Sequence, residues 1–309
     1  MFYLKNVFLE LTQEGLIREF GENFAKEEQS PGEPLGEWAA RLREKGIQLL
    51  TQGSERATLW ITDDAECAKA KVLRGEPVLG VLRDDLEQSF EGVRYLVSDL
   101  AEVELDYLEK VYRRQAGIPW DILETKRCIL RETSLRDRDA LYRIYDEPPV
   151  TDHLEKLPGD PDGFAAWLED YAKHVYALLE YGVWTICLKR NDAMGDAPFE
   201  HLGQCDAGNN LEDLVIGRAG LGVREGCSQP ELGFVIGKPW QGQGLALEVC
   251  EAILTYARDL RISEVIAFAE PENIASVGLL RRLGFEETGE INLDGKHCLA
   301  FRIVFEYNG

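Results

Sequence analysis

The sequence predicts an α/β protein with two domains, and three features lead to this expectation. The chain has 309 residues, a length that usually divides into more than one hydrophobic core. Its first third alternates short apolar runs with segments of helical composition, which is typical of a parallel sheet covered by helices. Near residue 127 the pattern changes to one strand, two helices and then several strands. We therefore expect one domain over residues 1–125 and a second over residues 126–309.

In the first domain, two apolar runs flank a helix-forming segment. Ala57–Thr62 and Pro77–Leu82 predict strands, and Asp64–Arg74 between them predicts a helix. The other elements expected in this domain are a helix over Leu35–Lys45 that ends at Gly46, strands over Ile47–Thr51 and Val93–Val97, and a helix over Leu100–Tyr112. Such repeated strand and helix units predict a small Rossmann-like parallel sheet.

The second domain follows a segment, Ala116–Glu124, that we interpret as a linker because Gly117 and Pro119 interrupt its helical pattern. The elements expected after it are a strand over Arg127–Glu132, a helix that Ser134 caps and Pro148-Pro149 ends, a helix over Gly163–Tyr181, and strands over Trp184–Lys189, Leu214–Val223 and Glu231–Gly237. Arg190–Asp213 is polar and too long for a tight hairpin, so we expect a mobile loop or an insertion there.

Composition and charge exclude several classes of protein. With 45% hydrophobic and 29% charged residues, the chain is neither disordered nor a collagen or disulfide scaffold. Its 34 Lys and Arg against 56 Asp and Glu give a net charge of -22. A surface with this excess of negative charge repels polyanions, so nucleic acid is not an expected partner. The acidity is spread over both halves and indicates solvation, with a weak preference for cationic substrates.

Membrane, disulfide and metal signals are absent from the sequence. No apolar run approaches the roughly 18 to 20 residues that span a bilayer, and Met1–Glu10 lacks the pattern of a signal peptide. We therefore expect a cytoplasmic protein with no membrane partner. The seven cysteines are odd in number and include no Cys-x-x-Cys pair, so we expect them to be reduced. The four histidines lie far apart, so we expect no metal site.

A glycine-rich turn is the most informative segment of the chain. The strand Glu231–Gly237 runs into Gln241-Gly242-Gln243-Gly244, and a helix over Leu245–Leu260 follows. Backbone N–H groups at such a helix start have no intrahelical partner, and the helix dipole adds partial positive charge there. An anion such as a pyrophosphate therefore fits this turn without any basic side chain. The alternative from these residues alone is a plain turn.

Two motifs of the second domain resemble one enzyme family. Gln241, Gly244 and Ala246 fit the Gln/Arg-x-x-Gly-x-Gly/Ala signature of the GNAT superfamily of acetyl-CoA-dependent N-acetyltransferases. Downstream, Asn273 and Ser276 lead to Gly284-Phe285, which resembles the Asn-x-x-Ser…Gly-Phe segment of that superfamily. The resemblance covers about residues 127–309. The strand motif Glu-Leu-Gly-Phe-Val-Ile looks most like the branch of ribosomal-protein and aminoglycoside acetyltransferases.

The resemblance implies a GNAT fold, which is a mixed sheet with splayed central strands, and it implies acetyl-CoA as cosubstrate. The strand holding Phe234–Ile236 would end in a bulge and diverge from Val265–Ala269, leaving peptide groups that bind the pantetheine arm. The implied cofactor contacts are Phe234, Val235, Ile236, the turn residues Gln241, Gly242, Gln243, Gly244, Leu245 and Ala246, and Asn273. A helix cap is the alternative role of Asn273.

Acetyl transfer needs a base for the attacking amine and a group that stabilises the departing thiolate. The resemblance places Glu231 as the base, and the alternative is a solvated carboxylate at a strand end. Many members carry a tyrosine where this chain has Leu280. Ser276 is therefore the candidate for the thiolate, and a capping role is its alternative.

Other side chains of the second domain have structural interpretations. We expect Cys250 and Cys298 to pack in the core rather than to act as acetyl-carrying thiolates. Trp240 is expected to pack under the cofactor. Trp167 and Tyr171 are expected either to line the acceptor pocket or to belong to the core.

The first domain loosely resembles haloacid dehalogenase-like proteins through Thr62-Asp63-Asp64 and the Gly75–Val81 unit. It lacks an Asp-x-Asp-x-Thr motif before this point and has no Gly-x-Gly-x-x-Gly motif. We expect Asp63 and Asp64 to cap the following helix, and we expect this domain to be non-catalytic and to serve interaction or substrate capture.

Two functions from different classes follow. The first is an N-acetyltransferase that moves acetyl from acetyl-CoA to a primary amine by direct attack, the acceptor being a small-molecule amine or a protein or peptide amine. The second is a CoA-binding sensor or interaction protein without turnover. Thiol release from acetyl-CoA over a panel of amines distinguishes them.

Overall fold

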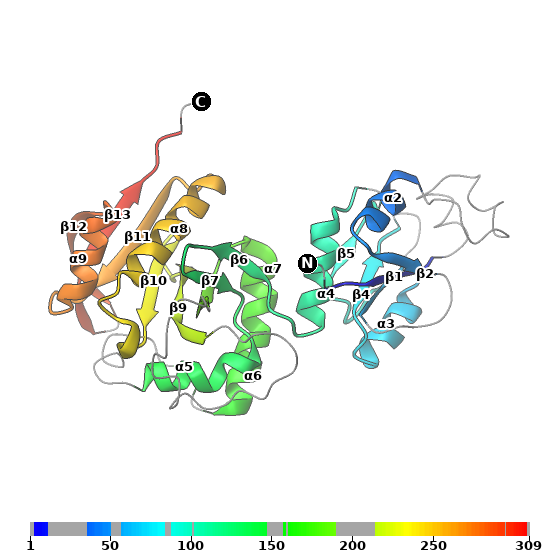
Figure 1. The fold of residues 1–309 in the computed structure, drawn as a ribbon, viewed down its shortest axis with the longest axis horizontal. Coiled ribbons are helices and arrows are strands. Elements are labelled where there is room, and N and C mark those ends of the chain that lie inside the picture. The colour runs from blue at the N-terminus through cyan, green and yellow to red at the C-terminus, as the bar shows by residue number, and fades with distance from the viewer. Residues whose placement is uncertain are drawn as a thin grey trace. The chain divides into compact units, whose positions relative to one another are not determined.

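The structure, a computed structural model, describes residues 3–11, 36–50, 57–83, 88–100, 102–146, 157–158, 160–189, 214–293 and 295–307. The chain separates into two compact units, Met1–Trp120 and Asp121–Gly309, whose elements are labelled in Figure 1. The division falls five residues before the boundary expected at residue 125. The segment Arg190–Asp213, expected to be a loop or an insertion, lies outside the described residues.

The N-terminal unit contains a five-stranded sheet in the order β2-β1-β3-β4-β5, with every neighbouring pair parallel. Its strands are β1 (Asn6–Glu10), β2 (Gln48–Leu50), β3 (Thr58–Thr62), β4 (Val78–Val81) and β5 (Leu96–Val97). Its helices are α2 (Gly36–Glu44), α3 (Ala65–Leu73) and α4 (Leu105–Gln115). The expected parallel sheet is therefore confirmed. The helix expected over Leu100–Tyr112 begins instead at Leu105.

Helices cover both faces of this sheet. Leu59 and Ile61 of β3 pack with the helix residues Leu42 and Leu108 on one face, so α2 and α4 lie there. Trp60 packs on the other face, toward α3. The strands are consequently apolar on both sides, as is usual for parallel sheets. β1, which our sequence analysis did not predict, lies between β2 and β3, and all of its residues except Glu10 are buried.

The C-terminal unit contains an eight-stranded mixed sheet in the order β12-β13-β11-β10-β9-β8-β7-β6 (Figure 1). Its strands are β6 (Asp121–Glu124), β7 (Cys128–Arg131), β8 (Val183–Leu188), β9 (Leu214–Gly222), β10 (Glu231–Ile236), β11 (Glu264–Ala269), β12 (Glu286–Leu293) and β13 (Lys296–Val304). Only β10 and β11 among these neighbours are parallel. The expected mixed sheet is confirmed. The interpretation of Ala116–Glu124 as a linker was wrong for its last four residues, because β6 pairs with β7.

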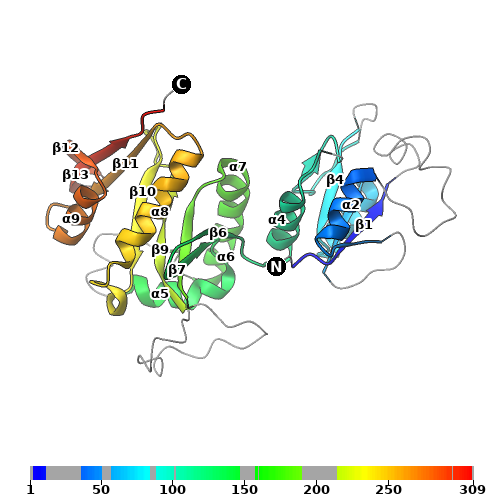
Figure 2. The same ribbon diagram turned by 45° about the horizontal axis from the view of Figure 1, so that its top comes forward.

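The two faces of this sheet carry different helices, as Figure 2 shows. α8 (Leu245–Asp259) packs Val249 and Ile253 against Leu232 and its neighbours on one face. On the other face, α5 (Arg138–Tyr145) and α6 (Pro161–Tyr171) pack around Phe164. The smaller helical elements are the 3₁₀ turns η2 (Leu135–Asp137) and η6 (Lys238–Trp240), the π-helix η4 (Ala172–Tyr176), and the helices α7 (Ala177–Leu179) and α9 (Ile274–Arg282).

Two sequence expectations for this unit need correction. The helix expected over Gly163–Tyr181 is continuous in α6 only to Tyr171, where a π-helical segment begins, and it ends at Leu179 before the left-handed Glu180. The bulge expected in the strand of Phe234–Ile236 is not there, because β10 pairs with β9 without a register shift. A shift occurs instead between β8 and β9, at Ile186 and Cys187. In the described part of the chain, no helix is long and apolar enough to cross a membrane.

Candidate functional site

The parallel strands β10 and β11 part immediately after they meet. Their register contains one pair, Glu231 with Ile266, and the N–H of Ile266 donates to the carbonyl of Pro230 at 3.0 Å. β10 stays paired with β9 as far as Ile236. The edge of β10 that faces β11 therefore makes no strand pairing over Phe234–Ile236. Such an edge accepts an extended ligand in the way that it would accept an added strand.

The turn after β10 leaves a helix start open. Gly242 and Gly244 have left-handed φ angles of 72° and 75°, which favour glycine. Gly244 is the N-cap of α8, so no side chain caps the first N–H groups of this helix. Gln241 anchors the turn, because its Nε2 donates to the carbonyl of Ile236 at 2.8 Å. The residues Gln241–Gly244 are exposed, and this turn is consequently an open site for an anion.

An arginine that our sequence analysis missed lies beside this turn. The Nη1 of Arg127 donates to the carbonyl of Gln243 at 2.9 Å. Its Nε and its backbone N–H donate to the two carboxylate oxygens of Glu248, both at 2.7 Å. A Cβ added at Gly244 would lie 3.7 Å from the Arg127 Nη2. Burial opposes ionisation of Glu248, but hydrogen bonds from Thr125 and Arg127 outweigh it and lower the pKa of that carboxyl.

Asn273 forms the helix cap that was its alternative role, and its cofactor contact stays a prediction. Its Oδ1 accepts the backbone N–H of Ser276 at 3.1 Å, so Asn273 caps α9. The side-chain NH₂ group is a separate donor that this contact does not use. Ser276 is half-buried one turn before Leu280, which is 1% exposed and belongs to the core.

Glu231 is the first residue of β10, and its side chain is 19% exposed. Arg224 holds the carboxylate with two hydrogen bonds, from Nη2 to Oε1 at 3.1 Å and from Nε to Oε2. The guanidinium of Arg224 also lies 5.5 Å from the ring centroid of Phe268 in β11. Glu231 is therefore a fixed, mostly buried carboxylate rather than a freely solvated one. It stands where β10 and β11 part.

The aromatic residues of α6 and η4 form a ladder. The ring centroids of Trp167 and Tyr171 lie 5.4 Å apart, and those of Tyr171 and Tyr176 lie 5.0 Å apart. The hydroxyl of Tyr171 accepts the N–H of Val183 at 2.9 Å, which ties the ladder to β8. Trp167 and Tyr171 remain half-buried, so they combine core packing with an accessible surface.

Three further side chains of this unit pack in or against the core. Cys250 and Cys298 are buried, and burial raises the pKa of both thiols. A raised pKa keeps these cysteines protonated and poorly nucleophilic. Trp240 in the turn is partly buried against the same core.

In the N-terminal unit the two aspartates differ. Asp64 caps α3, because its Oδ1 accepts the N–H groups of Glu66 at 2.8 Å and Cys67 at 3.0 Å. The same expectation for Asp63 was wrong, since its buried carboxylate pairs instead with Arg83 at 3.5 Å. No cluster of His, Cys, Asp and Glu in the described residues could hold a metal ion.

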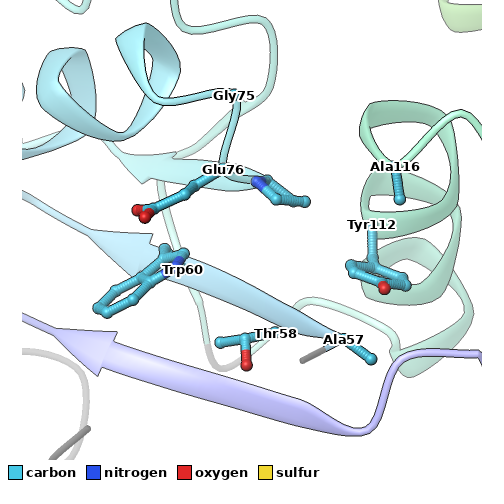
Figure 3. Close-up of a pocket in the computed structure, with 8 residues that line it drawn as sticks. Ala57, Thr58, Trp60, Gly75, Glu76, Tyr112 and Ala116 are labelled. Atoms are coloured by element: carbon cyan, nitrogen blue, oxygen red, sulfur yellow. The ribbon is translucent and has the colours of Figure 1, made fainter. Parts of the chain in front are cut away.

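A cavity of about 300 Å³ lies in this N-terminal unit, at the start of β3 and beside the end of α4 (Figure 3). It is lined by Ala57, Thr58, Trp60, Gly75, Glu76, Pro77, Tyr112 and Ala116. The carboxylate of Glu76 is paired with Lys71 at 3.6 Å. None of the residues predicted for acetyl transfer lines this cavity.

Comparison with known proteins decides the family. Residues 127–286, just over half of the chain, match the family model described as an acetyltransferase (GNAT) domain. The chain belongs to this GNAT family. It is an acetyl-CoA-dependent N-acetyltransferase that transfers acetyl to an amine, so the family and the activity expected from the motifs are confirmed. The loose resemblance of the N-terminal unit to haloacid dehalogenase-like proteins stays a prediction.

Three relatives illustrate the range of the family. The chain is 27% identical over 170 residues to the uncharacterized N-acetyltransferase p20 of Bacillus licheniformis, covering 55% of this chain and 84% of that protein. It is 44% identical over 81 residues to a [ribosomal protein uS5]-alanine N-acetyltransferase of Escherichia coli K12, covering 25% and 42%. It is 26% identical over 164 residues to an L-methionine sulfoximine/L-methionine sulfone acetyltransferase of Pseudomonas aeruginosa, covering 52% and 82%.

Proposed function

We propose that the acetyl-transfer site of this GNAT enzyme lies where β10 leaves β11, with Glu231 as general base and the glycine turn as the CoA-binding element. One observation carries this proposal. A single segment, residues 231–245, contains three features in order. They are a carboxylate held by an ion pair, a strand edge without backbone hydrogen bonds to a neighbouring strand, and a helix start without a capping side chain.

In this arrangement the amides of Phe234–Ile236 bind the pantetheine arm along the open edge of β10. The turn amides of Gln241–Ala246 bind the pyrophosphate, and the dipole of α8 favours its negative charge. Arg127 supports the turn through the Gln243 carbonyl and adds positive charge next to Gly244. The NH₂ group of Asn273 donates to the pantetheine arm while its Oδ1 keeps the cap of α9.

Glu231 then removes the proton from the acceptor amine, directly or through one water. The amine nitrogen attacks the thioester carbonyl, a carbon–nitrogen bond forms, and collapse of the tetrahedral intermediate breaks the carbon–sulfur bond. Arg224 keeps the Glu231 carboxylate in place, since it engages both oxygens while a carboxylate retains further lone pairs. The hydroxyl of Ser276 donates a hydrogen bond to the departing thiolate, which takes up a proton to leave as CoA.

The acceptor is a primary amine of a small molecule or of a peptide. The names of the relatives include both classes, since one acts on a ribosomal-protein alanine and another on a methionine derivative. Leu280 and the long Arg190–Asp213 segment are the features that leave a CoA sensor without turnover as the alternative; Leu280 is a core residue, Arg190–Asp213 lies outside the described residues, and no observation favours the sensor.

Replacement of Glu231 tests the assignment. In Glu231→Gln we expect kcat to fall roughly 10²- to 10⁴-fold, the range of general base catalysis. The Kd for acetyl-CoA, measured by calorimetry, should stay nearly unchanged, because Glu231 does not bind the pyrophosphate. The acidic limb of the kcat/KM profile should flatten. Direct attack further predicts intersecting initial-velocity lines.

Glu225→Gln is the matched control, since Glu225 is an exposed carboxylate near Arg224 in the sequence, and it should keep wild-type kinetics. Near-wild-type turnover in Glu231→Gln, or an acetyl group trapped on Cys250 or Cys298, would contradict the proposal.

A further inference from the structure

A buried arginine near the proposed site has no counter-charge among the residues that the structure describes. Arg218 of β9 is 5% exposed, and its Nε has no hydrogen-bond partner. Its Nη2 donates to the carbonyl of Val183 at 3.3 Å, and its Cζ lies 5.1 Å from the ring centroid of Trp167. No carboxylate of the described residues forms an ion pair with it. Burial of an unpaired charge is costly, so such a residue calls for a functional explanation.

A second arginine on the same face, Arg131, does have a carboxylate partner. Arg131 of β7 and Arg218 of β9 both stand opposite Thr185 of β8, so they share one face of the sheet. Arg131, whose side chain is 13% exposed, makes two hydrogen bonds to Asp137, at 2.8 and 2.7 Å. Asp137 also accepts hydrogen bonds from Ser134 and Thr185. The carboxylate of Asp137 is therefore engaged by these residues and not by Arg218.

The register places Arg218 on the same face as Glu231. Along β10 the residues Glu231, Gly233 and Val235 lie on one face and alternate with Leu232, Phe234 and Ile236 on the other, and Arg218 stands opposite Val235. The guanidinium reaches toward Val183, which stands opposite Gly220, and Gly220 in turn stands opposite Gly233. The arginine head is therefore shifted along the strand direction toward the level of Glu231, on the β8 side of β9.

On this face of the sheet, the position above Gly233 of β10 is open. A Cβ added at Gly233 would meet nothing within 4 Å, whereas a Cβ at Gly220 would collide with the Gly182 carbonyl. The Val183 carbonyl that Arg218 contacts lies on β8, two strands across the sheet from β10, and it is level with Gly233, which is about 7 Å along β10 from Glu231. A ligand that reaches both groups therefore crosses about two strand spacings, which is roughly 10 Å, and a hydrogen bond of about 3 Å at each end shortens the part that the ligand itself spans to a few bonds.

We infer that Arg218 binds the carboxylate of the acceptor, so that the preferred acceptor is an amino acid whose carboxylate lies a few bonds from the reacting amine. This inference rests on the proposed function, in which Glu231 receives the amine. The guanidinium and carboxylate make a charge-assisted pair that supplies the missing counter-charge. Trp167 and Tyr171 then form the wall beside the rest of the acceptor.

A substrate comparison on the wild-type enzyme tests this inference. Free L-amino acids, the corresponding α-carboxamides, and dipeptides with the same first residue are compared as acceptors with acetyl-CoA by thiol release. We expect kcat/KM for the preferred free amino acid to exceed that of its carboxamide by about 10²-fold, because hydrogen bonds between charged groups in buried sites are strong. Equal use of the free acid and its carboxamide overturns the inference, and so does a preference for the dipeptide.

Arg218→Gln should remove that preference, raising KM for the free amino acid about 10²-fold and leaving the carboxamide unaffected. The Kd for acetyl-CoA should not change. Arg218→Lys, which keeps a point charge, should recover part of the preference. A KM for the free amino acid that is unchanged in Arg218→Gln overturns the inference. The proposed function is judged separately, by acetyl-CoA binding and by the effect of Glu231→Gln on whichever amine is used.

A stability measurement separates recognition from a purely structural role. Arg131→Met leaves Asp137 buried without its partner, so its Tm should fall clearly. Arg218→Met removes an unpaired buried charge, so its Tm should be equal to or above that of the wild type. A fall in Tm for Arg218→Met as large as that for Arg131→Met would assign Arg218 to the scaffold and overturn the inference.

Discussion

Two turns in this chain each lead from a strand into a helix, but they differ in whether a side chain caps the helix start. After β3, the helix α3 starts at Asp64, whose own carboxylate accepts the N–H groups of Glu66 and Cys67. After β10, the helix α8 starts at Gly244, and no side chain caps it. Both helix starts carry the same partial positive charge. The carboxylate of Asp64 occupies the first helix start, and no capping side chain occupies the second, where we propose that a ligand anion binds.

The charged neighbours of the two turns support the same distinction. Beside the first turn, Asp63 is buried and paired with Arg83, so negative groups already occupy the region. Beside the second, the Arg127 guanidinium lies next to Gly244, and only its Nε side is turned to Glu248. The comparison teaches that a strand followed by a helix start indicates an anion site only when the cap residue has no side chain of its own. Three predictions test it.

The largest effect is expected at Gly244. In Gly244→Val, the branched side chain would enter the position of the pyrophosphate and disfavour the left-handed backbone. The wild type at 100 times the Kd of acetyl-CoA should gain about 2.7 kcal/mol of stability, and the variant should gain none. The measurement is the Tm with and without acetyl-CoA, and desulfo-CoA should act as acetyl-CoA does.

Gly75→Val is the matched control for this change. Gly75 follows α3 with a φ of 68°, and a Cβ there would meet nothing within 4 Å. It therefore carries the same backbone strain in the other unit without a nearby ligand. If Gly75→Val also lost the response to acetyl-CoA, or if Gly244→Val kept it, the pyrophosphate assignment would be wrong.

An intermediate effect is expected at Arg127. Arg127→Gln removes a guanidinium that donates to the Gln243 carbonyl and to Glu248, so the turn loses both a support and a positive charge. We expect the Kd for acetyl-CoA to rise about tenfold, which corresponds to one charge-assisted hydrogen bond. Calorimetry measures it. Lys126→Gln, at the exposed neighbouring residue, should leave the Kd unchanged, and an equal loss in both variants would point to net charge instead of this contact.

The smallest effect is expected at Asp64. Asp64→Ala removes the cap of α3 and should cost about 1 kcal/mol of stability in the N-terminal unit. Hydrogen exchange at the amides of Glu66 and Cys67 should accelerate, because these amides lose their acceptor. The Kd for acetyl-CoA should stay the same. A weaker Kd in this variant would mean that the two turns are coupled and that the comparison between them fails.

Much of the fold was predictable because its local patterns are strong. The strand and helix elements from Glu231 to Ala269 agree with the sequence expectation to within one residue, since a glycine turn and a long amphipathic helix mark their ends. β1 was missed because four of its five residues are buried, so the strand lacks the alternation of apolar and polar residues that marks a half-exposed strand. The break of the helix after Tyr171 was also missed, because a π-helical turn changes the hydrogen-bond register without changing the composition.

The candidate site also has a part that the sequence predicted and a part that it did not. The turn of Gln241–Ala246, Glu231 and Asn273 stood out in the sequence because each lies in a motif of neighbouring residues. The cap formed by Asn273 was foreseen as an alternative role, but the pairing of Asp63 with Arg83 was not foreseen. The sequence predicted carboxylates and an open turn; it carried no signal for the arginines that hold them.

The sequence by itself therefore determined the α/β class, the order of the elements around the glycine turn and the membership of the GNAT family. These follow from periodicity and from residues close together in the chain. Only the tertiary structure decided that Arg127 reaches Gln243 across 116 positions and that Arg218 stands on the face of Glu231. The reason is physical, because strand register and helix packing set which side chains meet, and no local pattern encodes a contact between distant strands.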